Sequence, residues 1–135
     1  SASLWENITL GNANIKEQDV LDTFKIVGLE SFYKSLNKGF DTHLEPTGKQ
    51  LSSSNVQKLL IARSLLNQPA LLLLDEPMKL IAADDKQYLQ NYLFGLKDVT
   101  IIFTTNDPSL ISKSEMVIHL EKGSIKSIQN KNASN

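Results

Sequence analysis

The first part of the chain has apolar residues at the spacing of an amphipathic helix. Asn14, followed three residues later by Glu17, matches the pattern of a capping box, which marks a helix start. Gly28 is of the type that commonly follows a helix end. We therefore expect a short helix up to Gly28, followed by a second helical stretch over about 29–36. The apolar positions of the first helix are Val20, Leu21, Phe24 and Val27.

The middle of the chain changes from turn residues to a long helical pattern. Residues 37–49 contain two glycines and a proline, which predicts a loop. Ser52 has the side chain of an N-cap, and residues 67–69 (Asn-Gln-Pro) stop a helix. We expect one long helix between these signals, with apolar side chains at Val56, Leu59, Leu60, Leu65 and Leu66.

After this helix the hydrophobic pattern becomes that of buried strands. Residues 70–74 form a short apolar run, as in a strand buried on both faces of a parallel sheet. Asp84 and Asp85 favour the start of a helix, and Gly95 lies near its end. The β-branched residues of 99–105 predict a second buried strand.

The last part of the chain predicts smaller elements. We expect a short helix at 108–113 and a third strand at 116–120. A hairpin turn and a fourth strand follow within 121–128, and the tail at 129–135 is expected to be frayed. A helical portion followed by strand-helix-strand alternation predicts an α/β fold with a helical subdomain, about 6–68, and a partial, mostly parallel sheet, 69–128.

Composition narrows the classes of partner. The 135 residues and 41% hydrophobic content suit one globular domain. Fourteen basic and fifteen acidic residues leave a net charge of -1, so no overall field favours nucleic acid. The absence of cysteine excludes disulfides and thiolate metal sites. The apolar run at 70–74 is far shorter than the roughly 20 residues that span a bilayer. Composition and charge therefore do not indicate a binding partner, and only specific sites in the sequence can.

Two adjacent carboxylates, Asp75 and Glu76, follow the predicted strand at 70–74. The carboxyl end of a parallel strand is where α/β folds place ligands. In P-loop NTPases a strand-end Asp holds hydrated magnesium, and a neighbouring Glu can polarise the water that attacks the γ-phosphate. By itself the run at 71–77 is equally consistent with a buried strand that ends at charge and proline. The surrounding sequence decides between the two.

Residues 51–65 read LSSSNVQKLLIARSL. They resemble, in register throughout, the signature helix of ATP-binding-cassette (ABC) transporter ATPases, usually written LSGGQ-x-Q-[RK]-x-x-[IL]-A-R-A-[IL]. Together with the acidic pair about twenty residues on, this combination is highly specific to the family. The chain therefore resembles the second half of an exporter-type ABC ATPase domain, a P-loop NTPase-like fold. Further matches lie at 4–8, after the family's Q-loop, at 104–107 around the switch position, and at 121–125 in the closing hairpin.

The resemblance implies roles in the use of MgATP. Asp75 would hold magnesium through water, Glu76 would promote hydrolysis, and Asn106 occupies the switch-histidine position. A second ABC subunit, in a homodimer or heterodimer, is implied as partner, as is a transmembrane domain that holds the assembly at the cytoplasmic face of the membrane. The signature residues that would contact ATP on the partner subunit are Ser52, Ser53, Ser54 and Asn55.

One part of an ATP site is missing from this sequence. A phosphate cradle needs G-x-x-x-x-G-K-[ST], and the only similar residues, Gly48-Lys49, are followed by Gln50 and preceded by His43 where the first glycine belongs. The resemblance implies that the P-loop half and the residue that stacks on adenine lie upstream of Ser1. We expect this portion by itself to be soluble and inactive, and to associate through surface that the other half covers.

Several positions depart from the family pattern. Ser53 and Ser54 stand where two glycines allow close approach to phosphate, and Asn106 cannot carry a positive charge. Ala82 stands at the D-loop aspartate, unless Asp84 or Asp85 substitutes for it. Two functions stay open: an exporter ATPase subunit in which MgATP hydrolysis drives export, and a degenerate cassette that binds ATP in a regulatory role without hydrolysis. A standalone half domain is the third hypothesis.

Overall fold

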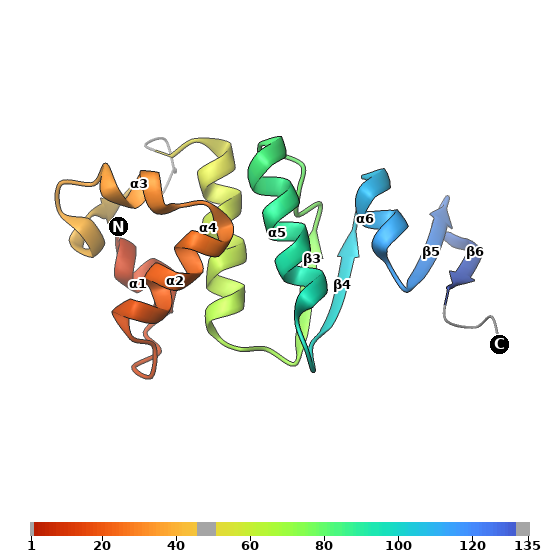
Figure 1. Cartoon of the computed structure of the whole chain (residues 1–135), viewed down its shortest axis with the longest axis horizontal. Helices are drawn as coiled ribbons and strands as arrows, with labels where there is room; N and C mark the ends of the chain where they lie inside the picture. Colours follow the sequence, from red (N-terminus) through yellow and green to blue (C-terminus); the bar gives the residue numbers. More distant parts are fainter. Residues whose placement is uncertain (1, 46–50, 132–135) are drawn as a thin grey trace. The chain divides into compact units, whose positions relative to one another are not determined.

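A computed structural model describes residues 2–45 and 51–131 of the chain. It contains two compact units, one up to Thr104 and one from Thr105 onward, and each is described by itself (Figure 1). The predicted loop features around Gly48 and Lys49 lie outside the described residues.

The first unit begins with the predicted helical portion. Helix α4 (Ser53–Leu66) packs against α1 (Leu4–Thr9) and α2 (Glu17–Val27), which lie beside it in Figure 1. Short elements complete this portion: β1 (Ala2–Ser3), α3 (Glu30–Lys34), the 3-10 turn η1 (Gly39–Asp41) and β2 (His43–Leu44), which pairs antiparallel with β1.

The core of this helical portion is apolar and partly aromatic. Leu4, Val20 and Phe24 are buried there. The rings of Trp5 and Phe40 lie 5.4 Å apart in an edge-to-face arrangement, which is a favoured geometry for aromatic pairs. The aromatic contacts of Phe40 with Trp5 and Phe24 join η1 to α1 and α2, and both of these helices also contact the long helix α4.

The start of α2 differs from the prediction, whereas its end agrees. The expected capping box at Asn14 is wrong, because the Lys16 backbone N–H donates to Asp19 Oδ2 at 2.8 Å, two residues later in the chain. Asn14 instead donates its backbone N–H to Asn12 Oδ1 at 3.0 Å in the turn before the helix. The predicted stop at Gly28 is confirmed by its φ of 75°, which suits glycine.

Two parallel strands and a connecting helix follow α4. Strands β3 (Leu71–Asp75) and β4 (Thr100–Thr104) pair in parallel from Leu71↔Thr100 to Asp75↔Thr104, and α5 (Ala83–Gly95) connects them. Helix α5 buries Leu89 and Leu93. The rings of Phe94 and Phe103 lie 6.2 Å apart. This βαβ unit confirms the predicted α/β class.

The strands are not buried on both faces as predicted. Leu72 and Leu74 are buried, whereas Leu73 is 68% exposed and its register partner Ile102 is 55% exposed. Side chains alternate between the two faces of a sheet, so the described residues cover only one face of this pair. The second face is an apolar surface made by Leu71, Leu73 and Ile102.

The second unit consists of a short helix and a hairpin. Helix α6 (Pro108–Lys113) begins as predicted and is capped by Asp107, whose Oδ1 accepts from Ser109 N at 2.8 Å. Strands β5 (Met116–Glu121) and β6 (Ser124–Asn130) pair antiparallel, which confirms the predicted hairpin. Gln129 and Asn130 belong to β6, so the expected tail does not begin at 129, and residues 132–135 lie outside the described part.

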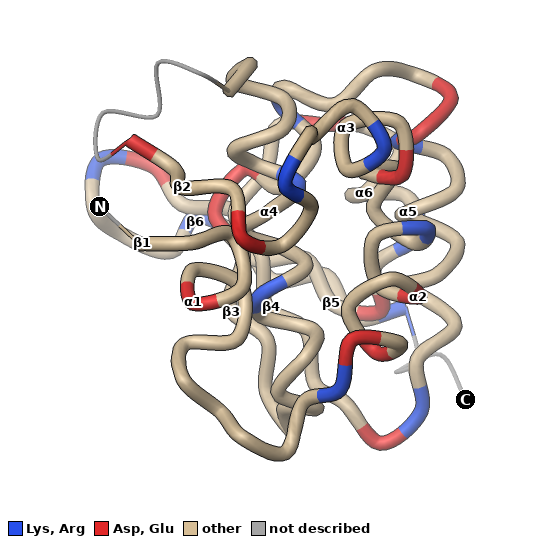
Figure 2. The backbone as a smooth tube through the Cα atoms, turned by 90° about the vertical axis from the view of Figure 1, so that its left-hand side faces the viewer, with Lys and Arg blue, Asp and Glu red and all other residues tan. Residues whose placement is uncertain are grey.

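Charged residues of both signs are interspersed along the backbone (Figure 2).

Between residues 2 and 131, leaving out 46–50, no helix combines the length and the hydropathy that crossing a bilayer requires.

Candidate functional site

The acidic pair lies at the carboxyl end of β3, where the sequence places it. Asp75 is exposed and Glu76 is half-buried. The Glu76 backbone N–H donates to Thr104 O at 3.0 Å and approaches Thr104 Oγ1 at 3.3 Å. The Thr104 hydroxyl in turn donates to Asp75 Oδ1. The last residue of β4 therefore holds both members of the acidic pair at one edge of the sheet.

Glu76 has a backbone conformation that is uncommon for its residue type. Its φ is 43°, in the left-handed region, where the Cβ of an L-residue is crowded. A strained residue at a strand end in this position is typical of ligand and catalytic sites. The conformation turns the chain sharply out of β3 into the segment 77–82.

Gln57 of α4 links the signature-like helix to this turn. Its side-chain Nε2 donates to Glu76 O at 2.7 Å, and its Oε1 accepts from Leu80 N at 2.9 Å. Sequence reasoning did not select Gln57 as a functional residue. The available signal was the second Gln of the signature pattern, which Gln57 matches.

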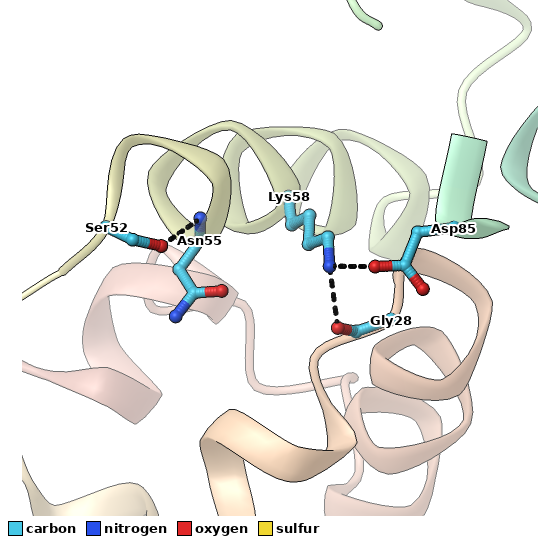
Figure 3. Close-up of polar contacts among 5 residues, drawn as sticks. All are labelled: Gly28, Ser52, Asn55, Lys58 and Asp85. Carbon is cyan, nitrogen blue, oxygen red and sulfur yellow. Dashed lines mark hydrogen bonds and ion pairs between the residues drawn. The ribbon is translucent and has the colours of Figure 1, made fainter. Parts of the chain in front are cut away.

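The N-terminus of α4 is organised as the sequence predicts. Ser52 Oγ accepts from Asn55 N at 3.1 Å, so Ser52 is the N-cap, as Figure 3 shows. Ser52 and Ser53 are exposed, and Ser54 and Asn55 are half-buried. Backbone N–H groups in the first turn and the positive end of the helix dipole favour an anion such as phosphate. The serine hydroxyls add further donors.

Lys58, one residue after Gln57, joins three elements in the same unit. Its Nζ lies 2.5 Å from Asp85 Oδ2 and donates to Gly28 O at 3.0 Å (Figure 3). The Lys58 side chain is only 7% exposed, and that of Asp85 is 39% exposed. Of the two acidic residues that could replace the D-loop aspartate missing at Ala82, Asp85 is held in this ion pair, whereas Asp84 is exposed in the first turn of α5.

Asn106 belongs to the second unit, unlike the other site residues. It is exposed and directly precedes Asp107, the N-cap of α6. Asp107 N donates to Thr105 Oγ1 at 3.0 Å, which shapes the turn at this position.

The oxygen donors at the end of β3 suit magnesium rather than a softer metal. Mg²⁺ commonly binds through one or two carboxylates and keeps several waters, and Asp75 offers an exposed carboxylate for this. Throughout 2–45 and 51–131, no three His, Cys, Asp or Glu side chains gather into a group that could hold a metal by themselves. A magnesium ion here would need further oxygen ligands from water or from a bound phosphate.

One hollow of the first unit does not coincide with these polar groups. It has a volume of about 380 Å³ and lies among α1, β2 and α4. Neither Asp75 nor Glu76 lines it; its walls include Ile8, Leu44, Val56, Leu60 and Arg63. The candidate site is therefore the group of polar residues around Asp75 and Glu76 and not this largely apolar hollow.

Comparison with known proteins finds similarity to ABC transporters. The model of the ABC transporter family matches residues 2–79. ABC transporter B family member 14 of Arabidopsis thaliana is 32% identical over 126 residues, which are 93% of this chain and 10% of that protein. Multidrug resistance protein 1 of Plasmodium falciparum (isolate FC27 / Papua New Guinea) is 31% identical over 119 residues, 86% of this chain and 8% of that protein.

A solved structure has the same fold. The structure of a bacterial Atm1-family ABC exporter with ATP bound superposes with a TM-score of 0.86 at 23% identity, and covers 97% of this chain and 23% of that one. The chain thus spans about a tenth of the two curated relatives and under a quarter of the solved exporter chain.

Proposed function

The chain belongs to the ABC transporter family, and we propose that it is the carboxy-terminal part of an exporter-type ATPase domain that couples MgATP hydrolysis to export. The observation that carries this proposal is the juxtaposition of the acidic pair at the end of β3 with the signature-like helix α4, joined through Gln57. The names of the relatives, a multidrug resistance protein and an ABC exporter, support it.

Asp75 and Glu76 have different roles in this proposal. Asp75 would hold magnesium through a water ligand, and bound magnesium would neutralise charge on the β- and γ-phosphate oxygens. Glu76 would orient the attacking water and accept its proton as a general base. Asn106, at the switch position, would offer an amide donor to the γ-phosphate in place of a charged imidazole.

The N-terminus of α4 would act on a different ATP molecule. Ser52, Ser53, Ser54 and Asn55 would cap the γ-phosphate of ATP bound by a second ABC subunit, in a homodimer or a heterodimer. The P-loop half of the domain and a transmembrane domain complete the proposed assembly at the cytoplasmic face of the membrane. We propose 6–68 as the helical and signature subdomain and 69–128 as the carboxy-terminal strands.

The experiment that tests this proposal is an ATPase assay of the full-length protein with Glu76→Gln. Removing a positioned general base typically lowers kcat on the order of 100-fold or more. A matched control is Glu17→Gln, an exposed carboxylate in the first turn of α2. Wild-type activity in Glu76→Gln would overturn the proposal.

A second function is favoured by the departures from the family pattern. In this alternative, the side chains of Ser53 and Ser54 would block close approach to phosphate rather than act as donors, and Ala82 and Asn106 would each lack a group that the family pattern has. Loss of one preorganised contact costs on the order of 100-fold in rate. The protein would then bind ATP and close without appreciable turnover. Under this alternative, Ser53→Gly with Ser54→Gly and Asn106→His raises a low basal ATPase. Fast hydrolysis by the unaltered protein would exclude it.

A further inference from the structure

We propose that Gln57 is a positioning residue for ATP hydrolysis, and that its side-chain amide fixes the backbone of Glu76 and thereby the direction of the Glu76 carboxylate. This inference rests on the proposed function, in which Glu76 orients the attacking water. Gln57 does not touch the reacting atoms in this proposal; it acts through Glu76.

The first step of the argument is that Gln57 uses both ends of its amide on one short segment. Nε2 donates to Glu76 O at 2.7 Å, and Oε1 accepts from Leu80 N at 2.9 Å. These two contacts determine which end of the amide is oxygen and which is nitrogen. Gln57 therefore spans the turn from Glu76 to Leu80 in a single orientation.

The second step concerns the peptide groups on either side of Glu76. Its N–H is held by Thr104 O at 3.0 Å on β4, and its carbonyl is held by Gln57 on α4. With φ at 43°, Glu76 occupies a region that non-glycine residues adopt only when surrounding contacts enforce it. The two bonds act on opposite sides of the same Cα, so together they hold the strained conformation.

The third step is the consequence for the side chain. Rotation about the N–Cα bond of Glu76 moves its Cβ and its carbonyl group together, so a carbonyl that is held by Gln57 restricts φ and with it the direction of the carboxylate. Catalytic groups lose effect when they move by about 1 Å from a productive geometry. Gln57 is half-buried and lies two residues after Asn55 on α4. Because α4 packs against α1 and α2, the Gln57 amide is held by a packed helix.

The test uses the full-length protein with two substitutions of Gln57. Gln57→Leu removes both hydrogen bonds, and Gln57→Glu retains the acceptor for Leu80 N but loses the donor to Glu76 O. We expect both to lower kcat roughly tenfold or more with KM for ATP within about twofold, because the interaction acts on the chemical step. Hydrogen exchange at the Leu80 amide should become faster in Gln57→Leu but not in Gln57→Glu.

A matched control is Gln18→Leu. Gln18 is an exposed glutamine on α2 whose amide donates to Asp22 Oδ1 at 2.9 Å, so its loss should leave kcat and Leu80 exchange unchanged. Thermal melting of every variant separates positioning from folding. If Gln57→Leu does not fold, Gln57→Glu still tests the donor bond, because it keeps a side chain of the same size.

The outcomes separate this inference from the proposed function. A wild-type protein that hydrolyses ATP, loses activity in Glu76→Gln and keeps its kcat in both Gln57 variants overturns the positioning role alone. If KM and kcat change together with a large drop in melting temperature, Gln57 is only structural and the inference is also overturned. If the wild type does not hydrolyse ATP, the proposed function fails, and unchanged Leu80 exchange in Gln57→Leu would overturn the hydrogen-bonded link as well.

Discussion

Lys58 Nζ lies 2.5 Å from Asp85 Oδ2, and this ion pair connects the signature-like helix α4 to the start of α5. The two side chains differ in exposure, at 7% for Lys58 and 39% for Asp85. Gly28 O, at the end of α2, accepts a second hydrogen bond from the same ammonium group at 3.0 Å. The buried ammonium group of Lys58 thus links the middle of α4 to the first turn of α5 and to the carboxyl end of α2.

We expect removal of the carboxylate to cost more stability than removal of the lysine. Asp85→Ala leaves a buried ammonium without its counter-ion and should lower the free energy of unfolding by about 2 kcal/mol. Lys58→Met leaves a carboxylate that is partly exposed to water and should cost less, about 1 kcal/mol. Urea denaturation of the purified protein measures both. Asp84→Ala, at the exposed neighbour, serves as control, and equal effects at 84 and 85 would contradict the importance of the pair.

Gly28→Ala should destabilise the protein through two separate effects. At φ 75° an alanine is strained, and its Cβ would lie 2.8 Å from Asp85 Oδ1, so the ion pair must move. Gly11 has nearly the same φ, 77°, with nothing within 4 Å of the added Cβ, so Gly11→Ala measures the backbone strain alone. The expected cost is about 1 kcal/mol for Gly11→Ala and about 2–3 kcal/mol for Gly28→Ala. Similar melting temperatures for the two variants would show that contact with Asp85 is unimportant.

Protonation of the Glu6 side chain at low pH should lower the stability of helix α1. Hydrogen bonds from the Ser3 backbone N–H, and then from the Ser3 hydroxyl, lower the pKa of the Glu6 carboxyl from its ordinary value of 4.5. A carboxyl with a lowered pKa in the folded state contributes stability that is present above 4.5 and lost as pH falls through the folded pKa.

Glu6→Gln removes this titration. Its melting temperature should therefore decrease less steeply than that of the wild type when pH falls from about 6 to about 3. Glu17→Gln, which changes an exposed carboxylate in the first turn of α2, is the comparison. Parallel pH profiles for wild type and Glu6→Gln would contradict the prediction.

Loss of the Thr104 hydroxyl should weaken magnesium binding more than it lowers the stability of the fold. Thr104→Val removes the donor to Asp75 Oδ1 and keeps a β-branched side chain suited to β4. We expect a stability loss of about 1 kcal/mol and a several-fold rise in the magnesium concentration needed for half-maximal ATPase activity. Thr104→Ser retains the hydroxyl and should behave as wild type in the magnesium titration. If Thr104→Val also needs the same magnesium concentration as the wild type, the contact between Thr104 and Asp75 has no part in metal binding.

The elements predicted correctly are those with local signals. Ser52 as an N-cap, Gly28 as a helix end and the hairpin around Gly123 depend on residues within a few positions of each other. The capping box at Asn14 was wrong because the Lys16–Asp19 pair, two residues on, offers the same spacing with a better-placed carboxylate. Burial of β3 was mispredicted on one face, because an apolar run shows which side chains are hydrophobic but not what covers them.

The sequence by itself determined the order of helices and strands, the acidic pair at a strand end and the resemblance to a family, because helix caps, turn residues and motifs are encoded in short stretches. Only the tertiary structure decided that Gln57 holds Glu76 across 19 positions and that Lys58 pairs with Asp85 across 27. A side-chain hydrogen bond between distant positions depends on how helices and strands pack, and no local pattern specifies which polar groups that packing brings within about 3 Å.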